Sequence, residues 1–175
     1  EDHYDYSRMR QFECSVESLS ALPIDQLSSL GQDLMAVVAN ANKLVGVDGL
    51  VPLCCTSDGK EEENEGAFLE WLSLRDNRIV SLDCVAPLLS TLEHLSIEMN
   101  RVTSLEGLLS FERRRPSSLR TLLASNNQID DLEPLCSIGE GGVPTFVCLE
   151  TLGLYRNDIR SIPKNLTMSL PNLRH

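Results

Sequence analysis

Apolar residues recur along this chain at a fixed spacing, in a phrase that appears almost unchanged at two places. LEWLSLRDNRI at 69–79 is followed by LEHLSIEMNRV at 92–102, and both fit the pattern L-x-x-L-x-L-x-x-N-x-I-x-x-L. Alternation in L-x-L predicts a short strand whose leucines face a core while the residues between them face outward. The apolar positions after the asparagine belong to a return segment. Because one unit cannot bury its apolar side alone, we expect neighbouring units to stack into a solenoid.

The pattern occurs five times with the asparagine in place. These units begin at Leu34, Leu69, Leu92, Leu119 and Leu149. An earlier unit from Met9 keeps the apolar spacing but has Glu17 at the asparagine position, and Leu173 opens a further unit. Successive starts lie 23 to 35 residues apart, so we expect inserts at 54–66, about 112–118 and about 137–147. GEGGVP in the last insert lacks the spacing of a phosphate loop and is predicted to be a flexible connection.

The predicted fold is an α/β solenoid with a curved parallel sheet on its concave side and short helical, 3-10 or irregular segments on its convex side. DCVAPLLS and EGLLSFERR suit one or two helical turns, with Pro87 and Pro116 as punctuation. Each asparagine side chain is expected to bond the backbone of its own turn and of the next unit. We expect residues 1–30 to form an N-terminal cap with a degenerate first repeat, and 31–175 to form the repeats. The start at Glu1 and the end at LPNLRH indicate a fragment of a longer chain.

This pattern resembles that of the leucine-rich repeat family over residues 9–175. It looks most like the intracellular short-repeat subclass, represented by the nuclear regulatory subunit of protein phosphatase 1 and the outer-arm dynein light chain. The resemblance implies a non-enzymatic module or scaffold that binds another protein on its concave face, in a cytoskeletal, ciliary or flagellar assembly. It also implies an alternative, a regulatory subunit that binds a protein phosphatase.

The residues between the leucines are the candidates for partner binding. Trp71 and His94 occupy the same position in consecutive units, and tryptophan, tyrosine and arginine often dominate interface energies. The predicted partner-binding residues are Trp71, Arg75, His94, Glu98, Met99, Leu123, Tyr155 and Arg156. Packing of Trp71 on its neighbours or under the N-terminal segment is the alternative. For the binding role we expect Trp71→Ala to weaken binding and to leave the melting temperature nearly unchanged.

The net charge of −11 argues against nucleic acid or an anionic membrane as the main partner. The acidity is concentrated in residues 1–66, which carry 13 acidic against 4 basic residues. SDGKEEENEG at 57–66 contributes to it and is predicted to be a solvated loop, with a docking site for a basic partner as the alternative. No apolar run is long enough to span a membrane.

Candidate chemistry is sparse. The six cysteines form no compact framework and no C-x-x-C pair, so they are predicted to be reduced, mostly buried thiols of an intracellular protein. The resemblance to the leucine-rich repeat family implies a cytoplasmic, cytoskeleton-associated location. His94 lies beside Glu93 but lacks the partners of a catalytic relay and is predicted to be a surface histidine. We therefore expect no enzyme activity, no metal and no cofactor, and the oligomeric state stays open. Arg113, Arg114 and Arg115 precede Ser117 and Ser118, a stretch that a basophilic kinase would accept as a substrate.

Overall fold

A computed structural model gives the fold of the chain. It describes residues 10–23, 25–27, 34–47, 50, 69–83, 85–109 and 116–175. Several features singled out from the sequence lie outside the described residues: the acidic segment 57–66, the arginines 113–115, and Cys54, Cys55 and Cys84.

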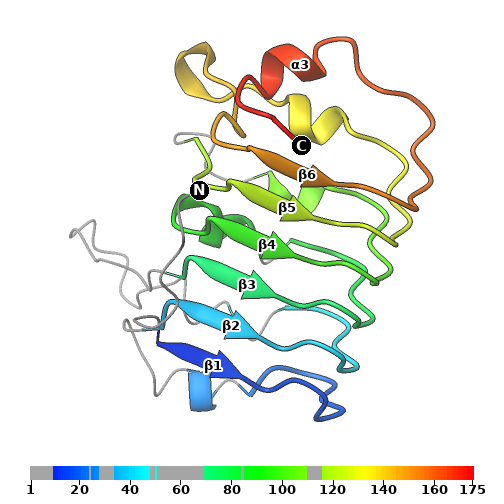
Figure 1. The fold of residues 1–175 in the computed structure, drawn as a ribbon. Coiled ribbons are helices and arrows are strands. Elements are labelled where there is room, and N and C mark those ends of the chain that lie inside the picture. The colour runs from blue at the N-terminus through cyan, green and yellow to red at the C-terminus, as the bar shows by residue number, and fades with distance from the viewer. Residues whose placement is uncertain are drawn as a thin grey trace.

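Six strands form one parallel sheet in which the order of the strands follows the order of the chain (Figure 1). The strands are β1 (Gln11–Glu13), β2 (Ala36–Val38), β3 (Trp71–Ser73), β4 (His94–Ser96), β5 (Thr121–Leu123) and β6 (Thr151–Gly153). In β3, β4 and β5 the central leucines Leu72, Leu95 and Leu122 pair in register. The predicted fold class, a leucine-rich repeat solenoid, is confirmed.

The core is a continuous column of aliphatic side chains between the sheet and the return segments. In the unit that begins at Leu69, the side chains of Leu69, Leu72, Leu74, Ile79 and Leu82 are fully buried. The same positions are buried in the units on either side. Each unit therefore completes its neighbour's apolar surface, as stacking of repeats requires.

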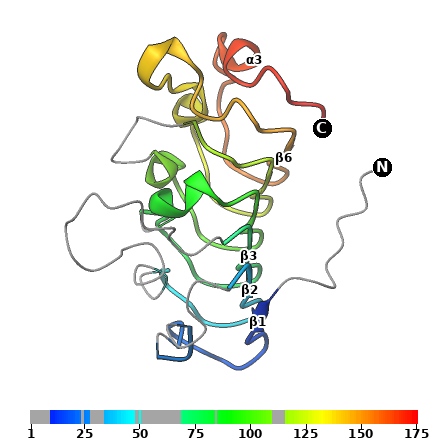
Figure 2. The same cartoon turned by 90° about the vertical axis from the view of Figure 1, so that its left-hand side faces the viewer.

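The return segments lie on the side of the molecule away from the strands (Figure 2). They contain the 3-10 helices η4 (Ala86–Ser90), η5 (Glu106–Leu108), η6 (Glu133–Cys136) and η7 (Glu140–Gly142), and the short helix α3 (Leu166–Ser169). Pro87 lies in the first turn of η4, where a missing backbone N–H leaves no donor unpaired. The segments predicted to be helical thus contain 3-10 turns at 86–90 and 106–108, and residues 110–114 of the second lie outside the described residues.

The insert at about 137–147 differs from the flexible connection predicted for it. A bridge joins Ile138 to Pro144, and the backbone N–H of Gly139 donates to the carbonyl oxygen of Val143 at 2.8 Å. Phe146 is fully buried just beyond this bridge. Burial of an aromatic ring and closure of a hydrogen-bonded loop hold the insert in place, a consequence of packing that its glycine-rich sequence does not reveal.

The repeated asparagines bond the backbone of their own turn, as predicted, but they reach the preceding unit and not the next one. The side-chain amide of Asn77 donates to the carbonyl oxygens of Leu74 in its own turn and of Ala39 in the preceding unit, both at 2.9 Å. Its Oδ1 accepts the backbone N–H of Leu44, again in the preceding unit. The prediction that the next unit receives these bonds was wrong.

The residue directly before each asparagine adopts a left-handed backbone conformation. These residues are Ala41, Asp76, Met99, Asn126 and Arg156, with φ angles of 53° to 58°. Such angles cost a non-glycine residue roughly 1 kcal/mol or more, and here the asparagine bonds and the buried flanks hold them in place. The conformation recurs in every complete unit, so it belongs to the scaffold and does not by itself mark a binding site.

Gly107 in η5 is required by a close approach between consecutive units. A Cβ atom at this position would lie 2.6 Å from the backbone nitrogen of Asp83 and 2.6 Å from the carbonyl carbon of Leu82. Both contacts are with backbone, which must move to admit a methyl group. We therefore expect Gly107→Ala to lower the free energy of unfolding by about 1 to 3 kcal/mol, measured by urea denaturation. Alanine at Gly141, where no atom lies within 4 Å but φ is +75°, tests instead the cost of left-handed backbone alone.

The last residues of the chain lie along the outer edge of β6. The backbone N–H of Arg174 donates to the carbonyl oxygen of Glu150 at 2.8 Å, and that of Leu152 donates to the carbonyl oxygen of His175 at 2.8 Å. His175 therefore lies beside Thr151 at the outer edge of β6. The relation is the same as that of Thr151 to Thr121 in the neighbouring strand β5. Among the described residues, no helix has the length and apolar character needed to cross a membrane.

Candidate functional site

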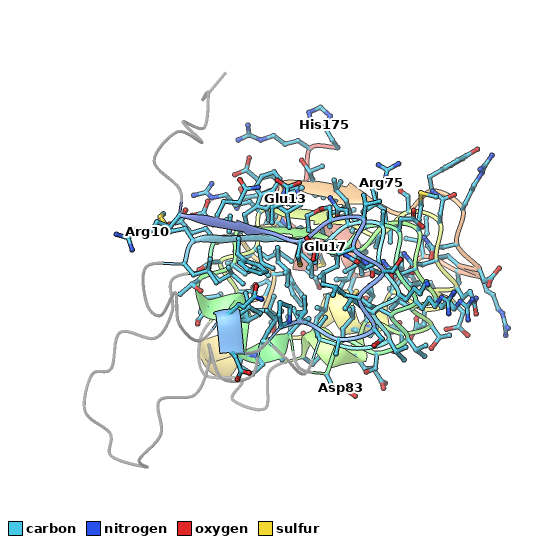
Figure 3. The ribbon with its side chains drawn as sticks, turned by 90° about the horizontal axis from the view of Figure 1, so that it is seen from below. Arg10, Glu13, Glu17, Arg75, Asp83 and His175 are labelled. Atoms are coloured by element: carbon cyan, nitrogen blue, oxygen red, sulfur yellow. The ribbon has the colours of Figure 1, made fainter. Side chains whose placement is uncertain are left out.

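The outward side of the sheet, opposite the core, presents two rows of side chains from the first and last residues of the strands. We call this side the strand face. The first row runs through Trp71, His94, Thr121 and Thr151, which pair in register across β3 to β6. Seen from below in Figure 3, Glu13, Arg75 and His175 lie on this side, and Asp83 lies on the opposite side with the return segments.

Trp71 and His94 form a stacked pair on the strand face. Their ring centroids lie 3.4 Å apart and the ring planes are inclined by only 7°. Both side chains are half-buried. Register pairing of β3 with β4 places the two rings on adjacent rungs, and offset or stacked aromatic pairs contribute about 0.5–1.5 kcal/mol beyond the area they bury. The predicted neighbourhood of the two residues is thus observed, and His94 is a half-buried histidine of the strand face that packs on the indole.

The electrostatic environment of the pair keeps His94 neutral. Desolvation by burial lowers the pKa of His94 from 6.5 to about 4. Desolvation also raises the pKa of Glu70, the residue before Trp71, and repulsion from the carboxylate of Glu93 adds to the increase. At neutral pH the site therefore combines a flat, uncharged pair of rings with neighbouring carboxylates.

The depressed pKa of His94 predicts a pH dependence of stability. Between pH 6.5 and about 4 the unfolded state binds a proton at this histidine that the folded state does not, so stability falls as the pH falls through this window. The raised pKa of Glu70 has the opposite effect, because it makes the folded state bind protons more readily as the pH falls. This contribution is common to the wild-type protein and to a His94→Asn variant. We expect wild-type protein to lose on the order of 1 kcal/mol more than His94→Asn between these limits, after solvent screening of a partly exposed group. Urea denaturation of both proteins across the window measures the difference, and parallel curves would contradict it.

Arg75 and Glu98 were predicted as separate binding residues, and the structure joins them. They occupy the same position in consecutive units, and the Arg75 guanidinium lies 3.3 Å from the Glu98 carboxylate. The Arg75 side chain is about half exposed, so this pair contributes little to stability. It adds a charged pair to the strand face, four residues along the chain from each of the two rings.

A second charged network was not included among the predicted site residues. Arg120 Nη1 lies 2.8 Å from Glu150 Oε1, and Arg120 Nε lies 3.4 Å from Glu93 Oε2. The three residues hold the second position of consecutive units, L-E-H-L, L-R-T-L and L-E-T-L, where the alternation of charge is visible in the sequence. Because these units start 27 and 30 residues apart, the contact becomes apparent only when the repeats are aligned.

Small side chains of the strand face are more buried than the alternation predicted. Ser73 and Ser96, expected to point into solvent, are buried, and Ala36 is only 3% exposed. The Ser73 hydroxyl donates to the Asn40 side chain at 2.8 Å. Larger neighbours cover these short side chains; Trp71, for example, pairs in register with Ala36. The short side chains form the base of the strand face and offer little surface to a partner.

The remaining predicted residues form no single group with the ring pair. Tyr155 is 69% exposed after β6, and the Arg156 guanidinium lies 5.2 Å from the centre of its ring. Leu123 is half-buried in β5, with its Cδ2 atom 3.3 Å from where a Cβ of Gly153 would lie. Met99 is exposed at a left-handed turn. The candidate site is therefore the ring pair with its charged neighbours, while the tyrosine and its arginine lie near the C-terminal end of the sheet.

Two further sequence features are clarified by their surroundings. The hydroxyl of Ser117 is buried and donates to the carbonyl oxygen of Leu89, and that of Ser118 donates to the carbonyl oxygen of Ser90 at 2.7 Å. A phosphate on either serine would break these bonds. In the part of the chain that the structure describes, Cys14, Cys136 and Cys148 are free thiols, and no group of three or more potential metal ligands occurs.

Comparison with known proteins identifies the fold and no more. No protein-family model matches the chain, and no curated protein matches it. Among solved structures, it is similar to the crystal structure of an internalin, InlF, from Listeria monocytogenes strain 4b F2365, with a TM-score of 0.53 and 18% sequence identity. The match covers 87% of this chain and 42% of the internalin chain, so the chain spans less than half of that protein. At this identity the likeness concerns the leucine-rich repeat solenoid that the six parallel strands build.

Proposed function

We propose that this chain is a non-enzymatic module that binds a partner protein on the strand face, centred on Trp71 and His94. The observation that carries the proposal is the stacked ring pair, which stays half-exposed although the aliphatic core beside it is closed. A solenoid holds such a surface in place before binding, so little conformational entropy is lost on association. The proposal assigns the partner's contact to this surface and assigns no catalytic role to His94.

The chemistry around the rings indicates what the partner presents. The flat faces and edges of an indole and a neutral imidazole accommodate an apolar side chain, or a cation held over the tryptophan. Glu70, whose carboxylate experiences repulsion from Glu93, is stabilised by a positive charge brought beside it. The partner surface that fits best therefore combines an apolar side chain with an adjacent lysine or arginine.

A scaffold role is our first choice for the consequence of binding. The proposal includes a cytoplasmic location with attachment to a cytoskeletal, ciliary or flagellar assembly, for which the free thiols and the resemblance of the repeats to the intracellular subclass give support. The alternative is a regulatory subunit that holds a protein phosphatase on the same face. Affinity capture with the immobilised protein distinguishes them: recovery of structural filament proteins favours scaffolding, and recovery of a phosphatase catalytic subunit favours regulation.

Replacement of the tryptophan tests the site itself. We expect Trp71→Ala to weaken binding of the captured partner by more than about 1 kcal/mol, as for an interface hot spot. Because the indole stacks on His94, we also expect a loss of about 0.5–1.5 kcal/mol in stability, in place of the unchanged melting temperature predicted from the sequence. Isothermal titration calorimetry measures the first effect and thermal unfolding the second.

A matched control separates the two effects of that replacement. Asp83 is exposed on the opposite side of the solenoid, so Asp83→Ala leaves partner binding unchanged if the strand face is the interface (Figure 3). Equal affinity of the wild-type and Trp71→Ala proteins, with Asp83→Ala reducing it, would move the interface to the return segments and overturn the proposal.

A further inference from the structure

Three basic residues stand in a column at the edge of the solenoid where the chain leaves the strands. Lys43, Arg78 and Arg101 each follow directly after the repeated asparagine of their unit. All three are exposed, whereas the asparagine before each and the aliphatic residue after each are buried. Alternation of buried and exposed positions directs the three basic side chains outward from the same edge. We call them the basic column.

Hydrogen bonds between successive units fix the residues of the basic column side by side. The backbone N–H of Arg78 donates to the carbonyl oxygen of Leu44, and that of Arg101 donates to the carbonyl oxygen of Ile79, both at 2.9 Å. The three basic side chains are therefore attached to neighbouring backbone segments that lie about one strand spacing apart, roughly 4.8 Å. In Figure 1 the segments that follow β2, β3 and β4 run side by side along the right-hand edge of the molecule.

No acidic side chain neutralises this column within the described part of the chain. The ion pairs there involve Arg75 and Arg120, and none involves Lys43, Arg78 or Arg101. Asp76, two residues before Arg78, forms none with it, and Glu98, three residues before Arg101, is occupied by Arg75. Within the described residues, three adjacent positive charges are thus uncompensated at one edge, although the net charge of the full sequence is −11.

An exposed apolar pair lies beside the column. Val45 is 58% exposed and Val80 is 47% exposed, and each lies two residues after a member of the column. Leu44 and Ile79 between them are fully buried, so each valine points to the same side as its basic neighbour. The backbone N–H of Val80 donates to the carbonyl oxygen of Val45 at 3.4 Å, which places the two valines on adjacent rungs.

We propose that the basic column and the valine pair together form a second docking surface, which binds an acidic segment of a partner protein that carries aliphatic side chains. The basic column attracts the acidic residues of the partner by charge complementarity, and the valine pair contacts the partner's aliphatic side chains. Nucleic acid fits less well, because three cations neutralise few phosphates. This surface is separate from the strand face, so the inference goes beyond the function proposed above.

Titration of a defined peptide tests the proposal. The probe is fluorescein-labelled Glu-Glu-Val-Glu-Leu-Glu-Glu, amidated at its C-terminus, followed by fluorescence anisotropy at low and at physiological salt. We expect Arg78→Glu combined with Arg101→Glu to weaken binding about tenfold at low salt, and added salt to weaken wild-type binding. Val80→Ser should weaken it severalfold. Arg160→Glu, an exposed arginine of the last complete unit, is the matched control and should change the affinity by less than about twofold.

Other outcomes overturn the proposal in distinguishable ways. Unchanged affinity in the double variant would remove the basic column from the site, and equal affinity for a peptide with serine at the valine and leucine positions would remove the valine pair. Tighter binding of a single-stranded oligonucleotide or of phosphatidylserine vesicles than of the peptide would show a general polyanion site instead. Thermal unfolding checks that the double variant is folded, and if it is not, Lys43→Ala and Arg101→Ala are tested singly. The Trp71→Ala variant should bind the peptide with the affinity of the wild-type protein, because Trp71 is not part of the second docking surface. A failure of this proposal can therefore be distinguished from a failure of the strand-face proposal.

Discussion

Leu95→Ala is expected to lower the free energy of unfolding by about 2 to 5 kcal/mol. Leu95 is the central residue of β4, is fully buried, and pairs in register with Leu72 on one side and Leu122 on the other. Removing three carbons from the middle of the column deprives both neighbouring units of contacts. Because parallel strands hold those neighbours in place, the cavity cannot close fully, and the loss should lie toward the upper part of the range.

Urea denaturation followed by circular dichroism measures the loss, with Thr121→Ala as the comparison. Thr121 is half-buried on the strand face next to His94, so its replacement should cost less than about 1 kcal/mol. Equal stabilities of the two variants would mean that the inward and outward positions of these units are exchanged. In that case the strand face described here would be part of the core.

The positions of the buried scaffold were predictable from the sequence because the same physical requirement acts in every unit. An aliphatic side chain that must pack on the units before and after it leaves the same mark every 23 to 35 residues, whatever lies in the inserts. Even the unit at Leu34, whose sequence looks helical at first, obeys this spacing and forms β2. Parallel pairing of the strands then follows from stacking alone.

Features that depend on distances between units were not predictable. Left-handed backbone occurs at Ala41, Asp76, Met99, Asn126 and Arg156, which share no property that marks it; what they share is the hydrogen-bonded asparagine that follows each of them. The direction of the asparagine bonds was likewise open. An asparagine amide at a turn could reach the preceding or the following unit, and the sequence does not distinguish the two directions.

The candidate site shows the same division. Alternation placed Trp71 and His94 on adjacent rungs, but the face-to-face contact and the consequent depression of the pKa of His94 depend on side-chain rotamers. Arg120 was not among the predicted site residues, because its bond to Glu150 crosses an insert. Burial of Ser73 depends on the size of its neighbours, which a two-residue period does not encode.

The asparagine column itself leads to the second large effect. We expect Asn100→Ala to lower the free energy of unfolding by about 3 kcal/mol. The Asn100 amide donates to the carbonyl oxygens of Leu74 and Ile97 at 2.9 and 3.0 Å, and its Oδ1 accepts the backbone N–H of Ile79 at 2.9 Å. Alanine leaves these groups without partners at a buried position. Each unpaired buried group costs about 1–3 kcal/mol, and the cost falls where water can enter.

Asn157→Ala is the control that separates lost hydrogen bonds from lost burial. Asn157 makes the corresponding bonds to Ala124, Leu154 and Ile129 with lengths of 2.9 to 3.0 Å, but it is only half-buried. Water reaches the orphaned groups there more readily, so this replacement should cost roughly half as much. Urea denaturation of the two variants gives the comparison. Equal losses would show that the bonds alone set the cost, and a larger loss at Asn157 would contradict a column that is held most firmly in its middle.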